Sequence, residues 1–448
     1  MNAPATIPLS RVADIVGATN VITEPSALAA YIVDGLAPQI AARPASAQEV
    51  SELVKFAAAE KLAVIPTGAR TKLGIGMPPA RYDLAIDMTR LDRVISYDPG
   101  DLTLSVEPGI PLAHLAEVLA EHNQFLPLDV PFSDRATVGG TLASGIDSPL
   151  RQAYGTARDF VLGMEFISGN GALTKSGGRV VKNVSGYDLH KLFLGSIGSL
   201  GVITRINFKT FPLPRASATF LASFADATAA ANFNSLIQKS SLRCQSVEIL
   251  SPKAAEILDA PTNEGWSVTV SIAGNDAVIT RAHRELETMA RSAAPNSLRN
   301  FVRLDTAAEK FLSLAIREFP ATAATNRAVV AKLSCLPDSI ASLCQQTSSI
   351  ADKHSIPAAH IFHGVGVGYC ALLTQGNSAA QLKECSQQLL ALGGTNNISA
   401  SIPCCSFELK RELSVWGPPR EDFILYQRVK RAFDAHNIFA PGRFVGGL

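Results

Sequence analysis

The chain has 448 residues, which is too long for one compact hydrophobic core, so two or three domains are expected. Hydrophobic residues make up 47% and charged residues 18% of the sequence, values typical of a folded globular protein. The formal net charge is +1, from 40 basic and 39 acidic side chains, and no cluster of Lys and Arg predicts a nucleic-acid-binding surface.

The N-terminus, MNAPATIPLSRVADIVG, lacks the basic segment and the apolar segment of a secretory signal peptide. No apolar run in the sequence approaches the roughly 20 residues that span a bilayer. We therefore expect a cytoplasmic protein, with no direct membrane span. Peripheral attachment to the inner membrane through a partner stays open.

The first strong helix signal begins at Ser46, which forms a capping box with Glu49 three residues later. The apolar residues that follow have helical spacing and comprise Val50, Leu53, Val54 and Ala57. Residues 61–65 form a short, mostly apolar run that predicts a strand ending at Pro66. The segment PTGARTKLGIG, residues 66–76, then predicts a glycine-rich turn after this strand.

Further strands are predicted at residues 84–87 and 102–106, and a helix at residues 112–121 that Pro111 opens at its first turn. Residues 139–201 then contain 13 of the 32 glycines, nearly three times their average density. Glycine costs conformational entropy on folding, so this density predicts backbone that closely approaches another group.

After about residue 216 the pattern changes to alternating strands and helices with few glycines, which predicts an α+β region with two ferredoxin-like halves. Its predicted elements are residues 216–224, 266–272, 276–293, 328–333, 339–353, 358–363, 368–373 and 382–392. A last helix is predicted at residues 423–435, and its basic stretch, Arg428–Arg431, is interpreted as a solvated face. The predicted domain boundaries are 1–215, 216–420 and 421–448.

The seven cysteines all lie beyond residue 240 and form no Cys-x-x-Cys pair. Their spacing therefore predicts neither a zinc site nor an iron–sulfur cluster. Scattered cysteines in a cytosolic chain are usually buried and reduced, and we expect the same here.

Three glycine-rich segments carry the functional argument. In the first segment, residues 66–76, three glycines and an alanine leave the backbone N–H groups accessible, so that these groups can line an anion-binding concavity. Arg70 and Lys72 add positive charge. In the second, residues 126–149, the run TVGGTLASG offers hydroxyl and N–H groups to a diphosphate. In the third, residues 154–204, the repeat GxxGxxG lacks Rossmann spacing and is interpreted as close backbone packing. Taken alone, the first segment is equally compatible with an ordinary tight turn.

Five segments, in this order, closely resemble the FAD-binding domain of the vanillyl-alcohol-oxidase-like flavoprotein superfamily. Within it they are most similar to the FAD-binding subunits of bacterial glycolate oxidase, the smaller of the two in particular, and to the related D-lactate dehydrogenases. The segments are PTGARTKLGIG, PLDVP…ATVGGTLASG, YGTARDFVLGMEF, GGRVVKNVSGYDLHKLFLGSIGSLGVIT and NIFAPGRF. The resemblance implies an α+β fold with a two-part FAD-binding domain of PCMH type, a ferredoxin-like α+β cap or substrate domain, and a C-terminal segment that returns to the FAD domain.

The resemblance also implies which residues bind FAD. They are Thr67, Gly68, Ala69, Arg70, Thr71, Leu73, Pro127, Asp129, Thr137, Gly140, Ser144, Gly145, Gly155, Arg158, Asp159, Val202 and Ile203. Some superfamily members attach the flavin covalently through a histidine in the first loop. Here that loop has Arg70 and neither histidine nor cysteine, so FAD would be held non-covalently.

Relatives that oxidise hydroxy acids carry the segment His-x-Gly-Asp-Gly-Asn-x-His, which holds a metal and a catalytic histidine. The matching stretch here, residues 363–370, keeps only His363, so no metal is expected. Oxidising a 2-hydroxy acid needs a base for the hydroxyl proton and a cation for the carboxylate. The candidates are His363 as the base and Arg317 and Arg327 as the cations. His360 lies three residues earlier on the same predicted strand and would point to the opposite face.

The resemblance implies an FAD-dependent 2-hydroxy-acid oxidoreductase of the glycolate oxidase type, which oxidises glycolate to glyoxylate. Its electrons would pass to a partner iron–sulfur subunit and then to quinone, in a complex with a homologous FAD subunit. The smaller FAD-binding subunit of glycolate oxidase is generally shorter than this chain. Two alternatives stay open: a stand-alone FAD-dependent alcohol or sugar dehydrogenase or oxidase, and a non-catalytic FAD-binding scaffold subunit.

Overall fold

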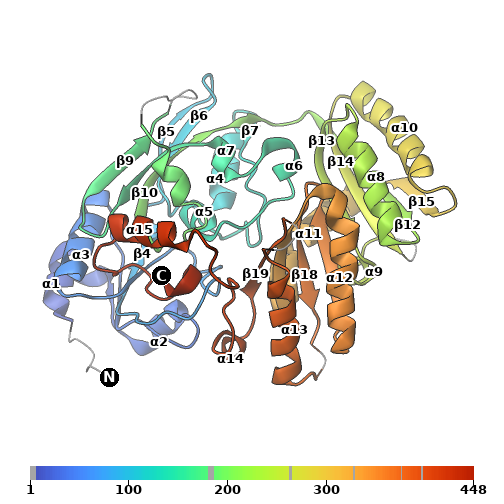
Figure 1. The fold of residues 1–448 in the computed structure, drawn as a ribbon. Helices are drawn as coiled ribbons and strands as arrows, with labels where there is room; N and C mark the ends of the chain where they lie inside the picture. Colours follow the sequence, from blue (N-terminus) through green and yellow to red (C-terminus); the bar gives the residue numbers. More distant parts are fainter. Residues whose placement is uncertain (1–6, 180–185, 262–264, 326–327, 375, 395–396) are drawn as a thin grey trace. The chain divides into compact units, whose positions relative to one another are not determined.

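The computed structural model describes residues 7–179, 186–261, 265–325, 328–374, 376–394 and 397–448. The chain divides into two compact units (Figure 1). Unit 1 comprises Met1–Ile146, Thr156–Leu213 and Pro418–Leu448, and unit 2 comprises Asp147–Gly155 and Pro214–Gly417. Each unit has hydrophobic clusters of its own, and both mix helices with sheets.

The first sheet of unit 1 has the strand order β1-β2-β4-β3. Its strands are β1 (Val21–Ile22), β2 (Ile40–Ala42), β3 (Val64–Thr67) and β4 (Leu84–Asp87), and its helices are α1 (Leu9–Val16), α2 (Pro25–Leu28) and α3 (Ala47–Ala59). The predicted start of α3 is confirmed, because Ser46 Oγ accepts a hydrogen bond from Glu49 N at 3.1 Å. Strand β3 continues through Pro66 to Thr67, two residues beyond the predicted strand, and pairs with β4 over this length.

The second sheet of unit 1 is antiparallel, with the order β5-β6-β10-β8-β9. Its strands are β5 (Val94–Asp98), β6 (Thr103–Val106), β8 (Val161–Ile167), β9 (Leu173–Gly177) and β10 (Val202–Lys209); β7 (Gln124–Phe125) pairs separately with β11 (Phe211–Pro212). Its helices are α4 (Leu112–Ala120), α5 (Val138–Ser144) and α7 (Ala157–Phe160). The core of this part is rich in aromatic side chains, including Phe160, Phe166, Phe193 and Phe208. The two sheets form the two parts of the first domain that the sequence predicts.

The C-terminal segment lies beside β3. Val64 N donates to Ile438 O at 2.7 Å, and Ala440 N donates to Val64 O at 2.8 Å. A parallel bridge between Val64 and Phe439 results, so the last residues of the chain extend the first sheet. The segment therefore belongs to unit 1, although more than 200 residues of unit 2 precede it in the sequence.

Helix α15 (Phe423–Phe433) leads into this segment and carries the basic stretch Arg428–Arg431. Lys430, within that stretch, is only 5% exposed. Its Nζ donates to Asp434 Oδ2 at 2.6 Å and to the carbonyl oxygens of Ser199 and Phe439, each at 2.8 Å. The interpretation of the whole stretch as a solvated face is therefore wrong, because the buried Lys430 ammonium group donates hydrogen bonds to three buried oxygen atoms.

Unit 2 contains one eight-stranded antiparallel sheet with the order β15-β12-β14-β13-β17-β18-β16-β19. The strands are β12 (Ala216–Phe224), β13 (Cys244–Leu250), β14 (Trp266–Gly274), β15 (Leu298–Arg303), β16 (Val329–Ser334), β17 (Ala358–His363), β18 (Val367–Leu372) and β19 (Ser399–Cys404). Each half has four strands, and both halves have the same strand order when they are read from the outer strand of the sheet inward. This order is fourth, first, third and second along the chain. The two predicted ferredoxin-like halves are thus confirmed, and they join where β13 pairs with β17.

The helices of unit 2 are α6 (Arg151–Tyr154), α8 (Ala227–Lys239), α9 (Pro252–Ile257), α10 (Asp276–Ala293), α11 (Thr306–Thr325), α12 (Ile340–Lys353), α13 (Ala379–Ala391) and α14 (Phe407–Lys410). Residues of α9 and α11 share one buried cluster with alternate residues of the sheet, among them Leu221, Ile361 and Tyr369. Within the described part of the chain, every helix is too short or too polar to span a lipid bilayer.

Residues Asp147–Gly155 belong to unit 2, although the sequence places them inside the first predicted domain. Asp147 Oδ2 lies 2.5 Å from Lys332 Nζ, and Gln152 Nε2 donates to Gln238 Oε1 at 3.1 Å. These partners are distant in sequence, so no local pattern shows where this segment packs.

All seven cysteines are free. Cys244, Cys344, Cys370 and Cys385 are buried, and burial raises the pKa of each of these thiols above its usual value. Thiols in this state are protonated at neutral pH and unreactive. Cys335, Cys404 and Cys405 are partly exposed, so the expectation of buried thiols holds for four of the seven.

We expect Lys430→Met to destabilise unit 1, because the substitution leaves the Asp434 carboxylate and two carbonyl groups buried without their common donor. The free energy of unfolding should fall by about 3 kcal/mol, as when one partner of a buried ion pair is removed. Urea denaturation followed by circular dichroism measures the change. The exposed Arg431→Met on the same helix is the control and should change stability by less than about 0.5 kcal/mol. Equal stability of the two variants would contradict the prediction.

Candidate functional site

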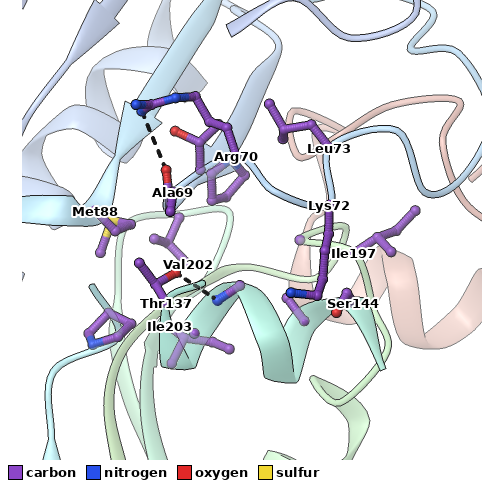
Figure 2. A pocket seen from close by; sticks show the side chains of 18 of the residues that line it. Ala69, Arg70, Lys72, Leu73, Met88, Thr137, Ser144, Ile197, Val202 and Ile203 are labelled. Atoms are coloured by element: carbon purple, nitrogen blue, oxygen red, sulfur yellow. Dashed lines mark hydrogen bonds between the residues drawn. The ribbon is translucent and has the colours of Figure 1, made fainter. Parts of the chain in front are cut away.

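Three segments of unit 1 that are far apart in sequence meet around a cavity (Figure 2). They lie within residues 66–75, 137–144 and 196–203. The residues predicted to bind FAD that line the cavity are Thr67, Gly68, Ala69, Arg70, Thr71, Leu73, Thr137, Gly140, Ser144, Val202 and Ile203.

The first segment approaches the second so closely that a side chain would not fit. A Cβ atom at Gly68 would lie 2.1 Å from Thr137 Oγ1, well inside contact distance. Thr67, one residue earlier at the end of β3, is 3% exposed, and its hydroxyl has no hydrogen-bond partner within the described residues. A buried polar atom of this kind in a cavity lining is a group that a ligand can satisfy.

Arg70 places a positive charge in the wall of this cavity. Its backbone has a left-handed φ of 64°, a conformation that costs a residue with a Cβ atom about 1–2 kcal/mol. The guanidinium Nη1 lies 2.8 Å from Asp87 Oδ2, and the same oxygen accepts a hydrogen bond from Tyr31 Oη at 2.5 Å. The guanidinium also stands 4.6 Å from the centre of the Tyr31 ring. Burial and the neighbouring Asp87 raise the pKa of Tyr31 above its usual value, so Tyr31 stays a hydrogen-bond donor.

The second segment contributes one side of helix α5. Thr137 Oγ1 caps the helix by accepting a hydrogen bond from Gly140 N at 3.4 Å, drawn as a dashed line in Figure 2. A Cβ atom at Gly139 would lie 2.6 Å from Pro108 Cβ, so this glycine packs against the protein. A Cβ atom at Gly140 would meet only Thr137 Oγ1, at 3.1 Å, and Gly140 therefore opens toward the cavity together with Ser144.

The third segment contains the repeated glycines. Gly198 has a φ of 76°, and a Cβ atom there would lie 3.2 Å from Pro66 Cδ. A Cβ atom at Gly201 would lie 2.6 Å from Ile167 O, so the interpretation of the repeat as close packing is confirmed. Residues 196–198 and Gly201 also line the cavity, which sequence reasoning did not foresee. The pattern GSIGSLG showed the glycines but not that they border a ligand site.

Arg443, near the end of the chain, is a further cavity residue that sequence reasoning missed. It is 2% exposed, and its Nη2 donates to Leu73 O at 2.5 Å and to Ile75 O at 2.7 Å. Burial lowers the pKa of its guanidinium to about 10, which leaves it charged at neutral pH. The C-terminal segment thus holds the first loop in place, and the motif APGRF was the only sequence signal for it.

These features suit a dinucleotide. An anionic diphosphate is bound best by backbone N–H groups, hydroxyls and fixed cations. The lining provides glycine-rich backbone, the hydroxyls of Thr67 and Ser144, and the guanidinium groups of Arg70 and Arg443. Leu73, Ile197 and Val202 add apolar surface, which flat aromatic rings require. The cavity therefore fits FAD in both its polar and its apolar parts.

Six predicted FAD-binding residues are outside the lining of this cavity, namely Pro127, Asp129, Gly145, Gly155, Arg158 and Asp159. Gly145 ends α5 with a φ of 60°, and a Cβ atom there would lie 2.7 Å from Gly195 Cα. Asp159 accepts a hydrogen bond from Thr156 N at 2.7 Å and so caps α7, next to the exposed Arg158. Gly155 belongs to unit 2. Contact of these six residues with FAD stays a prediction.

The two histidines of β17 point to opposite faces of the sheet, as predicted. His360 Nε2 is hydrogen-bonded to Thr347 Oγ1 of α12 at 2.8 Å, and burial lowers the pKa of His360 to about 4. It is therefore a neutral core residue. His363 is 3% exposed, and its Nδ1 lies 2.7 Å from Glu248 Oε2 on the neighbouring strand β13. His363 Nε2 is buried without a hydrogen-bond partner in the described part of the chain.

The structure describes one of the two arginines that are predicted to bind the substrate's carboxylate. Arg317 on α11 forms an ion pair with its neighbour Glu318 at 3.1 Å, and both side chains are about one-quarter exposed or less. Arg327 lies outside the described residues. A role of either arginine in binding a carboxylate stays a prediction.

Further charged and polar residues lie near His363, and sequence reasoning missed them. The ring of Tyr369 packs edge-on against the His363 ring, with 6.4 Å between their centres. Asp147 contacts Arg151 and Lys332. Burial alone would raise the pKa of Asp147, but these two cations and His363 lower it below its usual value. Within the described residues, no three His, Cys, Asp or Glu side chains converge as metal ligands would.

Both units match known protein families. The family described as FAD binding domain matches residues 38–177, and the family described as FAD linked oxidases, C-terminal domain, matches residues 213–395. The solved structure of p-cresol methylhydroxylase with substrate bound shares the fold, with a TM-score of 0.76 at 19% identity, over 97% of this chain and 95% of that chain. The chain thus contains an FAD binding domain and the C-terminal domain of FAD linked oxidases, and it has the fold of the vanillyl-alcohol-oxidase-like flavoproteins. FAD is therefore the cofactor, and the predicted two-domain α+β fold is confirmed.

Two relatives of this flavoprotein are subunits of glycolate oxidase by name. The chain is 39% identical to glycolate oxidase subunit GlcE of Escherichia coli (strain K12) over 171 residues, which are 38% of this chain and 48% of that subunit. It is 24% identical to glycolate oxidase subunit GlcD of Bacillus subtilis (strain 168) over 426 residues, which are 91% of this chain and 88% of that subunit. The GlcE match thus spans about half of that subunit's length.

Replacing Gly140 by Leu should abolish FAD retention, because the new side chain enters the cavity from α5. The FAD content per chain, read from the visible absorbance after purification, measures the effect. Gly178→Leu is a matched control, because a Cβ atom at Gly178 meets nothing within 4 Å and Gly178 is outside the cavity lining. Normal flavin content in the Gly140 variant would remove α5 from the site.

Replacing Arg443 by Met should weaken FAD binding about tenfold to hundredfold, since a hydrogen bond from a charged donor contributes roughly 1.5–3 kcal/mol. The reason is that the carbonyl groups of Leu73 and Ile75 lose the donor that fixes the first loop. Titration of the apoprotein with FAD, followed by flavin fluorescence, gives the dissociation constant. The exposed Arg428→Met should bind FAD like the wild type, and equal affinity of both variants would refute the anchoring role.

Proposed function

We propose that this flavoprotein oxidises a small 2-hydroxy acid, such as glycolate, to the corresponding 2-oxo acid. The observation that carries the proposal is the buried imidazole of His363 in unit 2. Its Nδ1 is engaged by Glu248, whereas its Nε2 has no hydrogen-bond partner among the residues that the structure describes. Oxidation of a hydroxyl group needs a base for the hydroxyl proton, and an imidazole nitrogen of this kind is suited to that task.

Charged residues of unit 2 complete the proposed chemistry. When bound, FAD supplies a two-electron acceptor for the hydrogen on the substrate's hydroxyl carbon. His363 Nε2 would take the proton of the hydroxyl group. Lys332 and Arg151, whose side chains are 30% and 21% exposed, would bind and orient the carboxylate. Arg317 on α11 is a further candidate for the same role.

The relatives support this substrate class and a complex of several subunits. Both GlcE and GlcD are named as subunits of glycolate oxidase. We therefore propose a homologous FAD subunit and an iron–sulfur subunit as partners of this chain. The iron–sulfur subunit would receive the electrons and pass them to quinone.

The proposal predicts that a 2-hydroxy acid reduces the flavin in the absence of oxygen. Glycolate and other small 2-hydroxy acids are added anaerobically, and bleaching of the flavin absorbance band is followed. His363→Gln should slow the reduction at least about 100-fold, because general base catalysis contributes roughly 10²–10⁴-fold. His360→Gln, on the opposite face of the same strand, should keep the rate within a few-fold.

Two results would replace the proposal. A flavin that no 2-hydroxy acid reduces, even with the partner subunits present, favours the scaffold alternative. Turnover of the isolated chain with an alcohol or a sugar and an artificial acceptor favours the stand-alone dehydrogenase.

A further inference from the structure

Glu248 is an acidic residue in an otherwise mostly apolar strand. It lies on β13 between Val247 and Ile249, and it is 1% exposed. The sheet register places it directly opposite His363 on β17, the strand that joins the two halves of the sheet. The Glu248 Oε2 and His363 Nδ1 atoms are 2.7 Å apart, and both side chains are less than 5% exposed.

The backbone around this pair leaves little freedom. Gly364 N donates to Val247 O at 2.7 Å, and Gly366 N donates to His363 O at 2.9 Å, so β17 ends in a fixed turn directly after His363. A Cβ atom at Gly364 would lie 2.5 Å from Asn234 Oδ1, which shows how tightly this turn is packed. The imidazole is therefore presented to Glu248 by the sheet itself and not by a mobile loop.

The contact decides which ring nitrogen carries the proton. An ionised carboxylate can only accept hydrogen bonds, so the proton of a neutral His363 must sit on Nδ1. The nitrogen left with a free lone pair is then Nε2, the atom that has no partner among the described residues. If Glu248 were protonated instead, Nε2 would carry a buried, unpaired N–H group, which costs about 1–3 kcal/mol.

The remaining charged and polar groups near the imidazole do not compete for Nδ1. Tyr369 on β18 packs against the ring edge-on, and Asp147 acts on His363 only through its charge. Asp147 is in turn held by Arg151 of α6 and Lys332 of β16. A positively charged His363 would thus have two carboxylates, Glu248 and Asp147, and two cations in its surroundings.

We propose that Glu248 is a positioning residue for the base of this enzyme: its carboxylate holds the His363 proton on Nδ1 and so keeps Nε2 free to accept the substrate's proton. This inference rests on the proposed function. In the oxidation, the substrate's O–H bond breaks and an Nε2–H bond forms. FAD, when bound, would accept the hydrogen on the hydroxyl carbon together with its electron pair, so that the carbon–oxygen bond would become a carbonyl. Glu248 stabilises the resulting imidazolium without taking up a proton.

The test combines nitrogen NMR with kinetics on the FAD-loaded protein. Protein labelled with ¹⁵N-histidine reports the protonated nitrogen of each ring, and the His363 signals are assigned as those absent from the His363→Gln variant. In the wild type, the neutral form of the His363 ring should have Nδ1 protonated and Nε2 unprotonated. In Glu248→Gln this preference should be lost, because an amide can donate to Nδ1 as well as accept from it.

The kinetic arm uses anaerobic flavin reduction by the 2-hydroxy acid that reduces the wild type fastest. Glu248→Gln should lower the limiting rate at least about 100-fold, as wrong-tautomer variants of carboxylate–histidine pairs do. The substrate concentration for half-maximal rate should stay within a few-fold, because Glu248 does not contact the substrate. Glu309→Gln, a glutamate on α11 in the same unit, is the control and should leave the limiting rate and the His363 tautomer unchanged.

The two arms separate this inference from the proposed function. A wild-type spectrum with the proton on Nε2 overturns the inference, as does a folded Glu248→Gln variant with an unchanged tautomer or an unchanged limiting rate. The wild-type spectrum remains decisive even if Glu248→Gln does not fold. A spectrum with the proton on Nδ1 that depends on Glu248, in a protein whose flavin no hydroxy acid reduces, supports the positioning role and refutes the proposed function alone.

Discussion

The FAD site depends on backbone contacts that exclude side chains. Gly68 touches Thr137, Gly139 touches Pro108, and Gly198 touches Pro66. The Gly68 and Gly198 contacts join the first cavity segment to the second and the third, and a Cβ atom at Gly68 would clash with Thr137. Residues of all three segments therefore line one cavity. The cofactor site is thus a consequence of how closely the two parts of unit 1 can approach. It requires no particular catalytic side chain.

Buried polar groups indicate where the protein leaves binding capacity for a ligand. Lys430 is surrounded by three acceptors, and Asp87 is occupied by Arg70 and Tyr31, so these groups stabilise the fold. Thr67 Oγ1 and His363 Nε2 are buried without a partner among the described residues. A buried polar atom without a hydrogen bond is costly, and a bound ligand can satisfy it. One of these two atoms lines the FAD cavity, and the other belongs to the proposed base.

The C-terminal half departs from the hydroxy-acid-oxidising members of the superfamily at one segment. Residues 363–370 retain a single histidine of the expected motif and none of its other metal-binding side chains. The retained His363 is paired with Glu248 across two strands, and Asp147, Lys332 and Arg151 lie in the same region of unit 2. Substrate oxidation by this protein would accordingly rely on a carboxylate-supported histidine and on cationic side chains.

The sequence by itself determined the local elements and the order of the glycine-rich segments, because capping residues, helical stripes and turns act over a few positions. The helix after Ser46, the two ferredoxin-like halves and the opposite orientation of His360 and His363 followed from such patterns. Only the tertiary structure decided that Arg443 reaches the first loop and that Lys430 is buried. It alone showed Glu248 opposite His363, since strand register joins residues that are 115 positions apart. Contacts across such separations depend on how whole elements pack, and no local pattern encodes them.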